Sequence, residues 1–254
     1  MSLSVNDWAR KLQRWLYPPA CVLCGSVVKE GDLCSGCGGE LPYNATACTR
    51  CALPLPNAAD DVQGCTNVAG GRAPGATLCG QCLQDPPSYD SAVSLFRYAY
   101  PADHLILRLK FQAQLHLARV LGELLAQHLK REIQTMPEII IPVPLHRTRL
   151  RERGFNQALE IARPIARSLS IPVDYKSCER VRKTSAQSLL PAAERRKNIK
   201  GAFRVTRPIT ARHVAILDDV MTTGHTVQEL AATLRKAGVE RIDVWVVARA
   251  AWDQ

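Results

Sequence analysis

The chain has 254 residues, of which 46% are hydrophobic, and it carries a formal net charge of +10 at pH 7. This length suits one or two domains with a hydrophobic core, and no apolar run reaches the roughly 18 residues of a membrane-spanning helix, so we expect no transmembrane segment. Residues 1–90 contain 6 Lys/Arg against 8 Asp/Glu and residues 91–254 contain 27 against 15, which places the basic excess in the second part.

Residues 1–19 predict an amphipathic N-terminal helix that ends at Pro18-Pro19. Its apolar residues recur at helical spacing: Val5, Trp8, Leu12, Trp15 and Leu16. Packing of the two tryptophans against a neighbouring domain is favoured over a role at a membrane surface. The segment has no apolar core of the kind that signal peptides need, so we expect a cytoplasmic protein.

Residues 20–88 predict a double zinc ribbon. Eight of the ten cysteines form four Cys-x-x-Cys pairs: Cys21/Cys24, Cys34/Cys37, Cys48/Cys51 and Cys79/Cys82. In a reducing compartment this spacing indicates zinc rather than disulfides, with about two ions per chain.

The four pairs can be combined at two metals in more than one way. Sequential pairing joins the first two pairs at one metal and the last two at another, whereas interleaved pairing gives a cross-brace. The short gap between Cys24 and Cys34 suits one β-hairpin and favours sequential pairing, but both stay open. A long Pro/Gly/Ala/Asn-rich insertion separates the third and fourth pairs. Cys65, inside that insertion, and Cys178 have no paired cysteine nearby, and we expect neither to be a ligand or a catalytic thiol.

Residues 89–254 predict an α/β domain with a mostly parallel sheet flanked by helices. Strand patterns cover 91–100, 138–143, 213–220 and 241–248, and helical patterns cover 102–112, 115–131, 156–169 and 226–237. Strands and helices that alternate at this spacing imply right-handed crossovers.

Two basic segments of this domain predict anion binding. The turn after the strand at 138–143 carries four arginines in seven residues: Arg147, Arg149, Arg151 and Arg153. Because arginine binds diphosphate oxygens in pairs, a pyrophosphate site is favoured over a solvated turn, with Arg147, Arg151 and Arg153 as its main cations. Residues 176–200 hold eight Lys/Arg against two Glu, which favours a lid over an anionic ligand, with Lys183 among its cations, above a plain surface loop.

The segment 214–226 predicts the most specific site. A run of branched apolar residues ends in Asp218 and Asp219, and a Thr-Thr-Gly-His-Thr turn leads directly into the helix at 226–237. The first turn of a helix offers unpaired N–H groups and a positive dipole end, which together bind phosphate. The residues of the turn are Thr222, Thr223, Gly224, His225 and Thr226.

The two carboxylates predict what carries that phosphate. Asp218 and Asp219 lie at the carboxyl end of a strand, where open α/β sheets bind their ligands. Because carboxylates repel phosphate, vicinal hydroxyls are better partners for them. A phosphorylated ribose supplies both groups, its phosphate for the turn and its 2′- and 3′-hydroxyls for the acids.

All thirteen positions of 214–226 resemble the phosphoribosyl-pyrophosphate (PRPP) motif of type I phosphoribosyltransferases. The order of the cysteine pairs, Val-Pro-Leu-His, Arg-Gly-Phe-Asn-Gln and the Asp-Asp turn resembles the ComF/GntX branch of that superfamily over about residues 21–250. The resemblance implies a type I phosphoribosyltransferase fold behind a zinc-ribbon domain, PRPP with Mg²⁺ at the site, and a role in DNA uptake. It implies that 142–153 form the pyrophosphate loop and 180–198 a flexible loop.

Three functions fit these features. The first is a phosphoribosyltransferase whose acceptor the sequence does not name, since no region that reads a nucleobase is recognisable. The second is an accessory protein that binds single-stranded DNA, which the 6% aromatic content weakens because such sites stack bases on aromatic rings. The third is a PRPP sensor without turnover.

Overall fold

The computed structural model describes residues 18–56, 77–183 and 199–251. Residues 1–17 of the predicted N-terminal helix, most of the insertion between Cys51 and Cys79, and residues 184–198 of the predicted lid lie outside these residues. The chain divides into two compact units, residues 1–41 and 42–254, so the four cysteine pairs are shared between them. No helix within the described residues is long and apolar enough to cross a bilayer.

The smaller unit is built around its cysteines. Gly25 adopts a left-handed conformation (φ +74°) and its N–H donates to the Cys21 carbonyl, which closes the turn after the first pair. Cys34 caps the short helix α2 (Ser35–Gly39) by accepting from the N–H of Cys37 at 3.4 Å. Both pairs therefore lie in tight turns.

The larger unit contains a four-stranded parallel sheet in the order β1, β6, β5, β2. The strands are β1 (Ser91–Arg97), β2 (Ile139–Pro142), β5 (His213–Met221) and β6 (Arg241–Arg249). Because all four run in the same direction, their carboxyl ends meet at one edge. That edge brings together residues that are far apart in the sequence.

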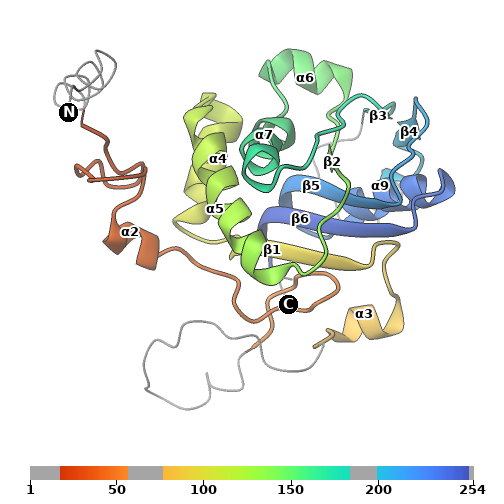
Figure 1. Ribbon diagram of the computed structural model, residues 1–254, viewed down its shortest axis with the longest axis horizontal. Coiled ribbons are helices and arrows are strands. Elements are labelled where there is room, and N and C mark those ends of the chain that lie inside the picture. Colours follow the sequence, from red (N-terminus) through yellow and green to blue (C-terminus); the bar gives the residue numbers. More distant parts are fainter. Residues whose placement is uncertain (1–17, 57–76, 184–198, 252–254) are drawn as a thin grey trace, which may run out of the picture. The chain divides into compact units, whose positions relative to one another are not determined.

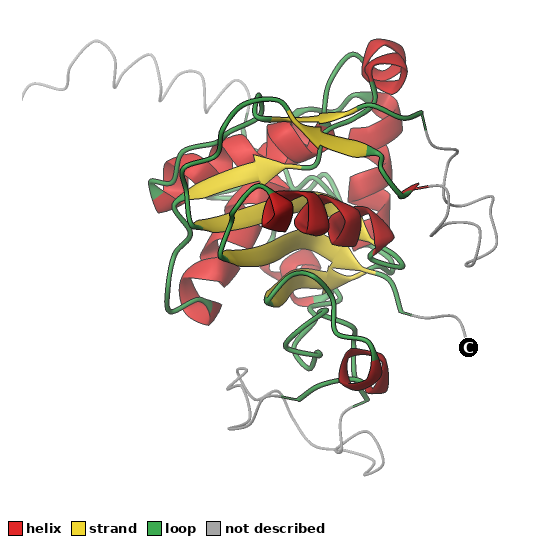
Figure 2. Cartoon of the chain, turned by 90° about the vertical axis from the view of Figure 1, so that its right-hand side faces the viewer, coloured by secondary structure: helices red, strands yellow, loops and turns green. Residues whose placement is uncertain are grey.

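Helices cover both faces of this sheet, as Figures 1 and 2 show. On one face lie α5 (His116–Glu132) and α7 (Gln157–Leu169), with α4 (Ala102–Gln112) packed on α5. The opposite face carries α9 (His225–Lys236). A two-stranded antiparallel sheet of β3 (Cys178–Arg180) and β4 (Phe203–Val205) lies beside α9.

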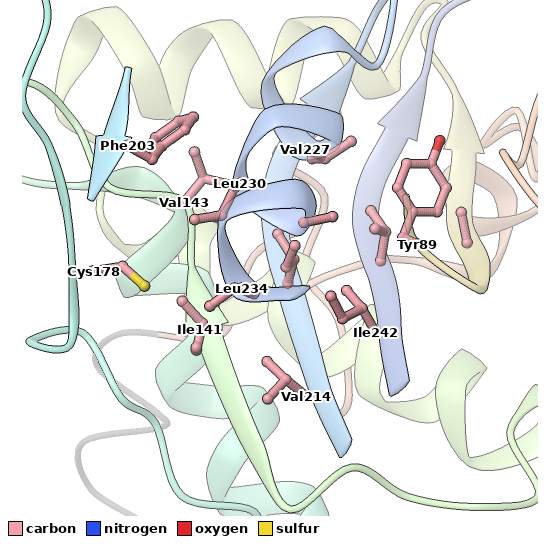
Figure 3. Close-up of a cluster of buried hydrophobic side chains, with 14 of the residues drawn as sticks. Tyr89, Ile141, Val143, Cys178, Phe203, Val214, Val227, Leu230, Leu234 and Ile242 are labelled. Atoms are coloured by element: carbon pink, nitrogen blue, oxygen red, sulfur yellow. The ribbon is translucent and has the colours of Figure 1, made fainter. Parts of the chain in front are cut away.

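The core beneath α9 follows the two-residue period of a strand. Val214 and Ile216 of β5 pack with Leu230 and Leu234 of α9 in one buried cluster, as Figure 3 shows for most of these side chains. The intervening residues of β5 are also fully buried, on the face that α7 covers. Burial on both faces explains why residues 214–217 form an unbroken apolar run in the sequence.

On the other face, α5 and α7 approach closely at a glycine. A Cβ placed on Gly122 would lie 2.4 Å from Pro164 Cγ and 2.7 Å from the Ile161 carbonyl oxygen. Pro164 thus lies inside α7 and packs directly on the backbone of α5. Glycine at position 122 is a requirement of this packing.

The predicted fold class is confirmed: the larger unit is a parallel α/β sheet flanked by helices, and a four-cysteine cluster lies in the N-terminal unit. The strands and helices predicted for residues 89–254 are present, with ends that differ by at most three residues. One local prediction differs from the structure. The arginine-rich segment expected as a turn forms the helix α6 (Arg147–Arg153), which His146 caps and Gly154 ends at φ +83°.

Candidate functional site

The carboxylates at the end of β5 are held in place by their own backbone. The Asp219 N–H donates to Asp218 Oδ1 at 2.9 Å, and the Val220 N–H donates to Asp219 Oδ1 at 2.8 Å. Asp219 is buried and Asp218 is partly exposed. Burial, and then the neighbouring charge of Asp219, raise the pKa of Asp218 to about 8. Negative charge on this pair of acids therefore costs free energy in the folded protein.

Lys110 reduces this free-energy cost because it places a positive charge beside the two acids. Its Nζ lies 2.8 Å from Asp219 Oδ2, and its side chain is 17% exposed. Lys110 comes from the last turn of α4, far from Asp219 in the sequence. The fold thus places a fixed cation against the acid pair, which lowers the pKa of Asp218 relative to burial alone.

The turn after β5 has the backbone of an anion site. Gly224 is the N-cap of α9 with φ +78°, a conformation that favours glycine, and its carbonyl accepts the Gln228 N–H at 2.9 Å. Thr223 Oγ1 and His225 Nδ1 lie 3.1 Å apart. The first turn of a helix presents its backbone N–H groups at the positive end of the helix dipole, and with threonine hydroxyls beside them such groups suit a phosphate.

The acid pair and two threonines of the turn, Thr222 and Thr226, open onto a cavity of about 700 Å³ at the carboxyl edge of the sheet. Its wall combines the acid pair and the turn with cationic and aromatic side chains. The lining residues on which the argument depends are Asp218, Asp219, Thr222, Thr226, Lys110, Arg149, Arg153, Arg180, Tyr98, Phe111 and Phe155. One cavity therefore offers partners for hydroxyls, for phosphate and for a planar ring.

The arginines of α6 divide by helical geometry. Arg149 and Arg153 are four residues apart, so they share a face of α6, and both line the cavity. Arg151 is exposed and Arg147 lies 3.6 Å from Glu179 Oε2; neither lines the cavity. Lys183 is exposed at the start of the segment that the structure does not describe. Binding roles for Arg147, Arg151 and Lys183 stay predictions.

Several lining residues were not predicted from the sequence. Arg180 ends β3, and burial lowers the pKa of its guanidinium, as it does for Arg153. Phe111 is 72% exposed, and the Arg153 guanidinium lies 5.5 Å from its ring centroid. Arg149 could have been identified from its four-residue spacing to Arg153, which the sequence did predict, had the segment been recognised as a helix.

The rest of the turn faces a second cavity, of about 350 Å³. Thr223, Gly224 and His225 line it together with Cys51 and Cys82, among others. The five predicted residues of the turn are thus divided: Thr222 and Thr226 face the larger cavity with the acid pair.

The eight paired cysteines form two clusters in the sequential pairing. One is Cys21, Cys24, Cys34 and Cys37, the other is Cys48, Cys51, Cys79 and Cys82, and the ligand atoms within each lie within 4.8 Å of one another. Two sulfur–sulfur distances are 3.8 Å (Cys24–Cys34) and 3.6 Å (Cys51–Cys79). Tetrahedral zinc with Zn–S bonds of about 2.3 Å needs sulfurs about 3.8 Å apart, so both clusters fit zinc.

Cys178 lies apart from both clusters. It is buried in β3, and burial raises the pKa of its thiol to about 12. A thiol of this kind is unreactive at neutral pH. This agrees with its predicted lack of a catalytic role.

Two family models match the chain. A double zinc ribbon domain matches residues 12–83, and a phosphoribosyl transferase domain matches residues 156–253. The first spans both cysteine clusters, and the second spans β5, the turn and α9.

Curated relatives match nearly the whole chain. Competence protein F of Haemophilus influenzae is 38% identical over 242 residues, covering 91% of this chain and 96% of that protein. DNA utilization protein YhgH of Escherichia coli O157:H7 is 35% identical over 238 residues, covering 91% and 97%. This chain belongs to the ComF/GntX family.

Among solved structures, the purine phosphoribosyltransferase of Pyrococcus horikoshii is similar with a TM-score of 0.29 and 18% identity, covering 64% of this chain and 94% of that one. The family assignment confirms the resemblance drawn from the sequence and rests on the curated relatives. In this ComF/GntX chain, the phosphoribosyltransferase motif lies on β5 and α9, and its acid pair faces the larger cavity.

Proposed function

We propose that this ComF/GntX protein binds PRPP, or a related phosphorylated ribose, in the larger cavity and acts in the uptake or use of external DNA. One observation carries the binding proposal: Asp218, Asp219 and Thr222 share a cavity with three arginines. Its volume of about 700 Å³ is that of a small-molecule site. The names of the relatives support the DNA-related role.

Each part of the ligand has a partner in this proposal. The 5′-phosphate accepts from the turn at 222–226, and the ribose 2′- and 3′-hydroxyls donate to Asp218 and Asp219. The pyrophosphate contacts the guanidinium groups of Arg149 and Arg153, which form paired hydrogen bonds with phosphate oxygens. Mg²⁺ brought in with PRPP would neutralise part of the pyrophosphate charge.

The reaction that such a site supports is phosphoribosyl transfer. The bond between the anomeric carbon and the pyrophosphate oxygen breaks, and the electron pair leaves with pyrophosphate. A nucleophile on the acceptor then bonds to the anomeric carbon and loses its proton to solvent. The protein positions the two partners, and its arginines stabilise the negative charge on the leaving group.

Two alternatives use the same surface. A sensor would bind PRPP without releasing pyrophosphate. A protein that binds single-stranded DNA would need aromatic rings beside cations, and the exposed Phe111 next to Arg153 supplies such a pair. That pair gives this alternative more support than the sequence did.

One experiment separates the three functions. Purified protein is titrated with PRPP and Mg²⁺, and separately with a single-stranded oligonucleotide, while pyrophosphate release is measured with candidate acceptors. Release in the presence of an acceptor supports the enzyme, and binding without release supports the sensor. Salt-sensitive DNA binding that survives Asp218→Asn with Asp219→Asn, but is lost in Phe111→Ala, supports the DNA-binding protein. Leu107→Ala, an exposed residue of α4 outside the cavity lining, is the control.

Absence of PRPP binding at millimolar concentration would refute the proposal.

A further inference from the structure

Arg249 is a charged residue in the interior of the larger unit. It ends β6 at the carboxyl edge of the sheet, and its side chain is 1% exposed. Burying a guanidinium group is costly unless its N–H groups are hydrogen-bonded. The hydrogen bonds of Arg249 must therefore offset the free energy of removing its charge from water.

Those contacts join two parts of the chain. Nε donates to the Cys51 carbonyl at 3.1 Å. Nη1 donates to the Met221 carbonyl at 3.1 Å, to the Ala250 carbonyl at 2.8 Å and to the Thr222 carbonyl. One side chain thus connects the backbone at a cysteine of the second cluster with the backbone where the phosphate turn begins.

At the turn, these bonds orient the groups that a phosphate needs. A peptide unit is planar and trans, so its C=O and the next N–H point in opposite directions. Holding the carbonyls of Met221 and Thr222 towards Arg249 therefore turns the N–H groups of Thr222 and Thr223 away from it. The direction of two donors in the turn is set by this guanidinium.

At the other end, the backbone of Cys51 depends on the second cluster. Cys48, Cys51, Cys79 and Cys82 are all buried, and a metal held by their sulfurs would fix the position of the Cys51 backbone. Ala52, which follows, is 1% exposed with φ +55°, and its carbonyl accepts from Asn44 Nδ2 at 2.9 Å. The Cys51 carbonyl is thus held within a closely packed segment.

The second cavity is evidence for the same connection. Cys51 and Cys82 line it from one side, and Gly224 and Arg249 line it as well. Tyr89, buried in the wall, has its hydroxyl 3.8 Å from the position that a Cβ on Gly224 would occupy. The cluster and the turn therefore border the same cavity.

We propose that Arg249 is a positioning residue that couples the second cysteine cluster to the phosphate turn, so that metal in this cluster strengthens binding of the phosphorylated sugar. The inference rests on the proposed function. It does not extend to the first cluster, which belongs to the unit formed by residues 1–41. Since coupling between two ligands is reciprocal in binding free energy, PRPP must in turn raise the affinity of the second cluster for zinc.

The test uses the full-length zinc-loaded chain and two measurements. Calorimetry gives the Kd for PRPP in the wild type, in Arg249→Lys, in Cys82→Ser and in Cys24→Ser, the last being the matched control in the first cluster. Competition with a chelating dye at equilibrium gives the zinc Kd of Cys24→Ser, which keeps only the second cluster intact, with and without PRPP. Thermal melting identifies any variant that fails to fold.

We expect the Kd to rise about tenfold in Arg249→Lys and in Cys82→Ser, and by less than about twofold in Cys24→Ser, in keeping with couplings of about 5- to 150-fold. Arg249→Lys combined with Cys24→Ser should bind zinc more weakly than Cys24→Ser alone, even without PRPP. A folded Arg249→Lys protein with the wild-type Kd for PRPP, or a zinc Kd that PRPP does not change, overturns the coupling alone. A wild type that does not bind PRPP overturns the proposed function and the coupling with it.

Discussion

Replacing Lys110 by glutamine should destabilise the larger unit far more than the loss of an ordinary ion pair. Lys110 and Asp219 are 17% and 5% exposed, and the atoms of the pair are 2.8 Å apart. Without the ammonium group, Asp219 remains buried beside Asp218, whose charge burial already disfavours. The variant therefore keeps two adjacent carboxylates and loses the cation that faces them.

The size of the effect follows from the geometry. At 2.8 Å and an effective dielectric constant of about 20, the attraction is about 6 kcal/mol. Desolvation offsets part of it, and removing one partner of a buried pair typically costs about 3–5 kcal/mol. Because the cavity admits water to the acid pair, we take the lower end, about 3 kcal/mol. For a unit of this size that lowers Tm by about 6–12 °C.

Urea unfolding at pH 7 of the wild type, Lys110→Gln, Asp219→Asn and the double variant measures this directly. The double variant should recover about 2 kcal/mol of the loss, since the coupling between the two positions disappears. Arg119→Gln is the control, because its pair with Glu123 is 47% exposed on both sides and should be worth under about 0.5 kcal/mol. A loss in Lys110→Gln no larger than in the control would refute the reasoning.

Four further predictions concern single features of the fold and site. Asp218→Asn with Asp219→Asn should abolish measurable PRPP binding by calorimetry while the protein still unfolds cooperatively, at a Tm lowered because Lys110 loses its partner; retained affinity would contradict the assigned roles. Because the pKa of Asp218 is raised, the folded state binds more protons than the unfolded state between about pH 4 and 8, so the free energy of unfolding should fall as pH rises through that range, and less so in Asp218→Asn. Gly224→Ala should cost about 1 kcal/mol through its positive φ and weaken phosphate binding; an unchanged Kd would show that the turn tolerates a new backbone. Gly122→Val should cost at least about 2 kcal/mol in urea, because its side chain would collide with Pro164 and with backbone; a loss below 1 kcal/mol would mean that α5 and α7 separate easily.

The sequence predicted the segment 213–237 almost residue by residue, because every local signal in it agreed. Residues 214–217 of its strand are an unbroken apolar run, the glycine of the turn has the positive φ that glycine favours, and the following helix keeps its apolar spacing. Sequential pairing of the cysteines was favoured by spacing and left open, and it is the pairing that the fold adopts.

Contacts between distant parts of the chain could not be predicted in this way. Lys110 reads as a solvated residue at a helix end, and its partner lies 109 positions later. Arg249 reads as an exposed charge that closes a strand, and its burial depends on a carbonyl 198 residues earlier. The α6 segment was predicted as a turn from its four arginines, although the residues at its two ends, His146 and Gly154, are the ones that cap a helix in the structure. An ion pair or hydrogen bond between residues far apart in the sequence leaves no pattern in the sequence around either residue.

The central claim is that a phosphorylated ribose binds where β5 passes into α9. A crystal of the protein grown with PRPP and Mg²⁺ tests it most directly. The account predicts density for the 5′-phosphate within hydrogen-bonding distance of the backbone N–H groups of residues 222–226, with the ribose diol on Asp218 and Asp219. Density for PRPP elsewhere on the protein, with the acid pair still bound to Lys110 and no ligand beside it, would contradict the account.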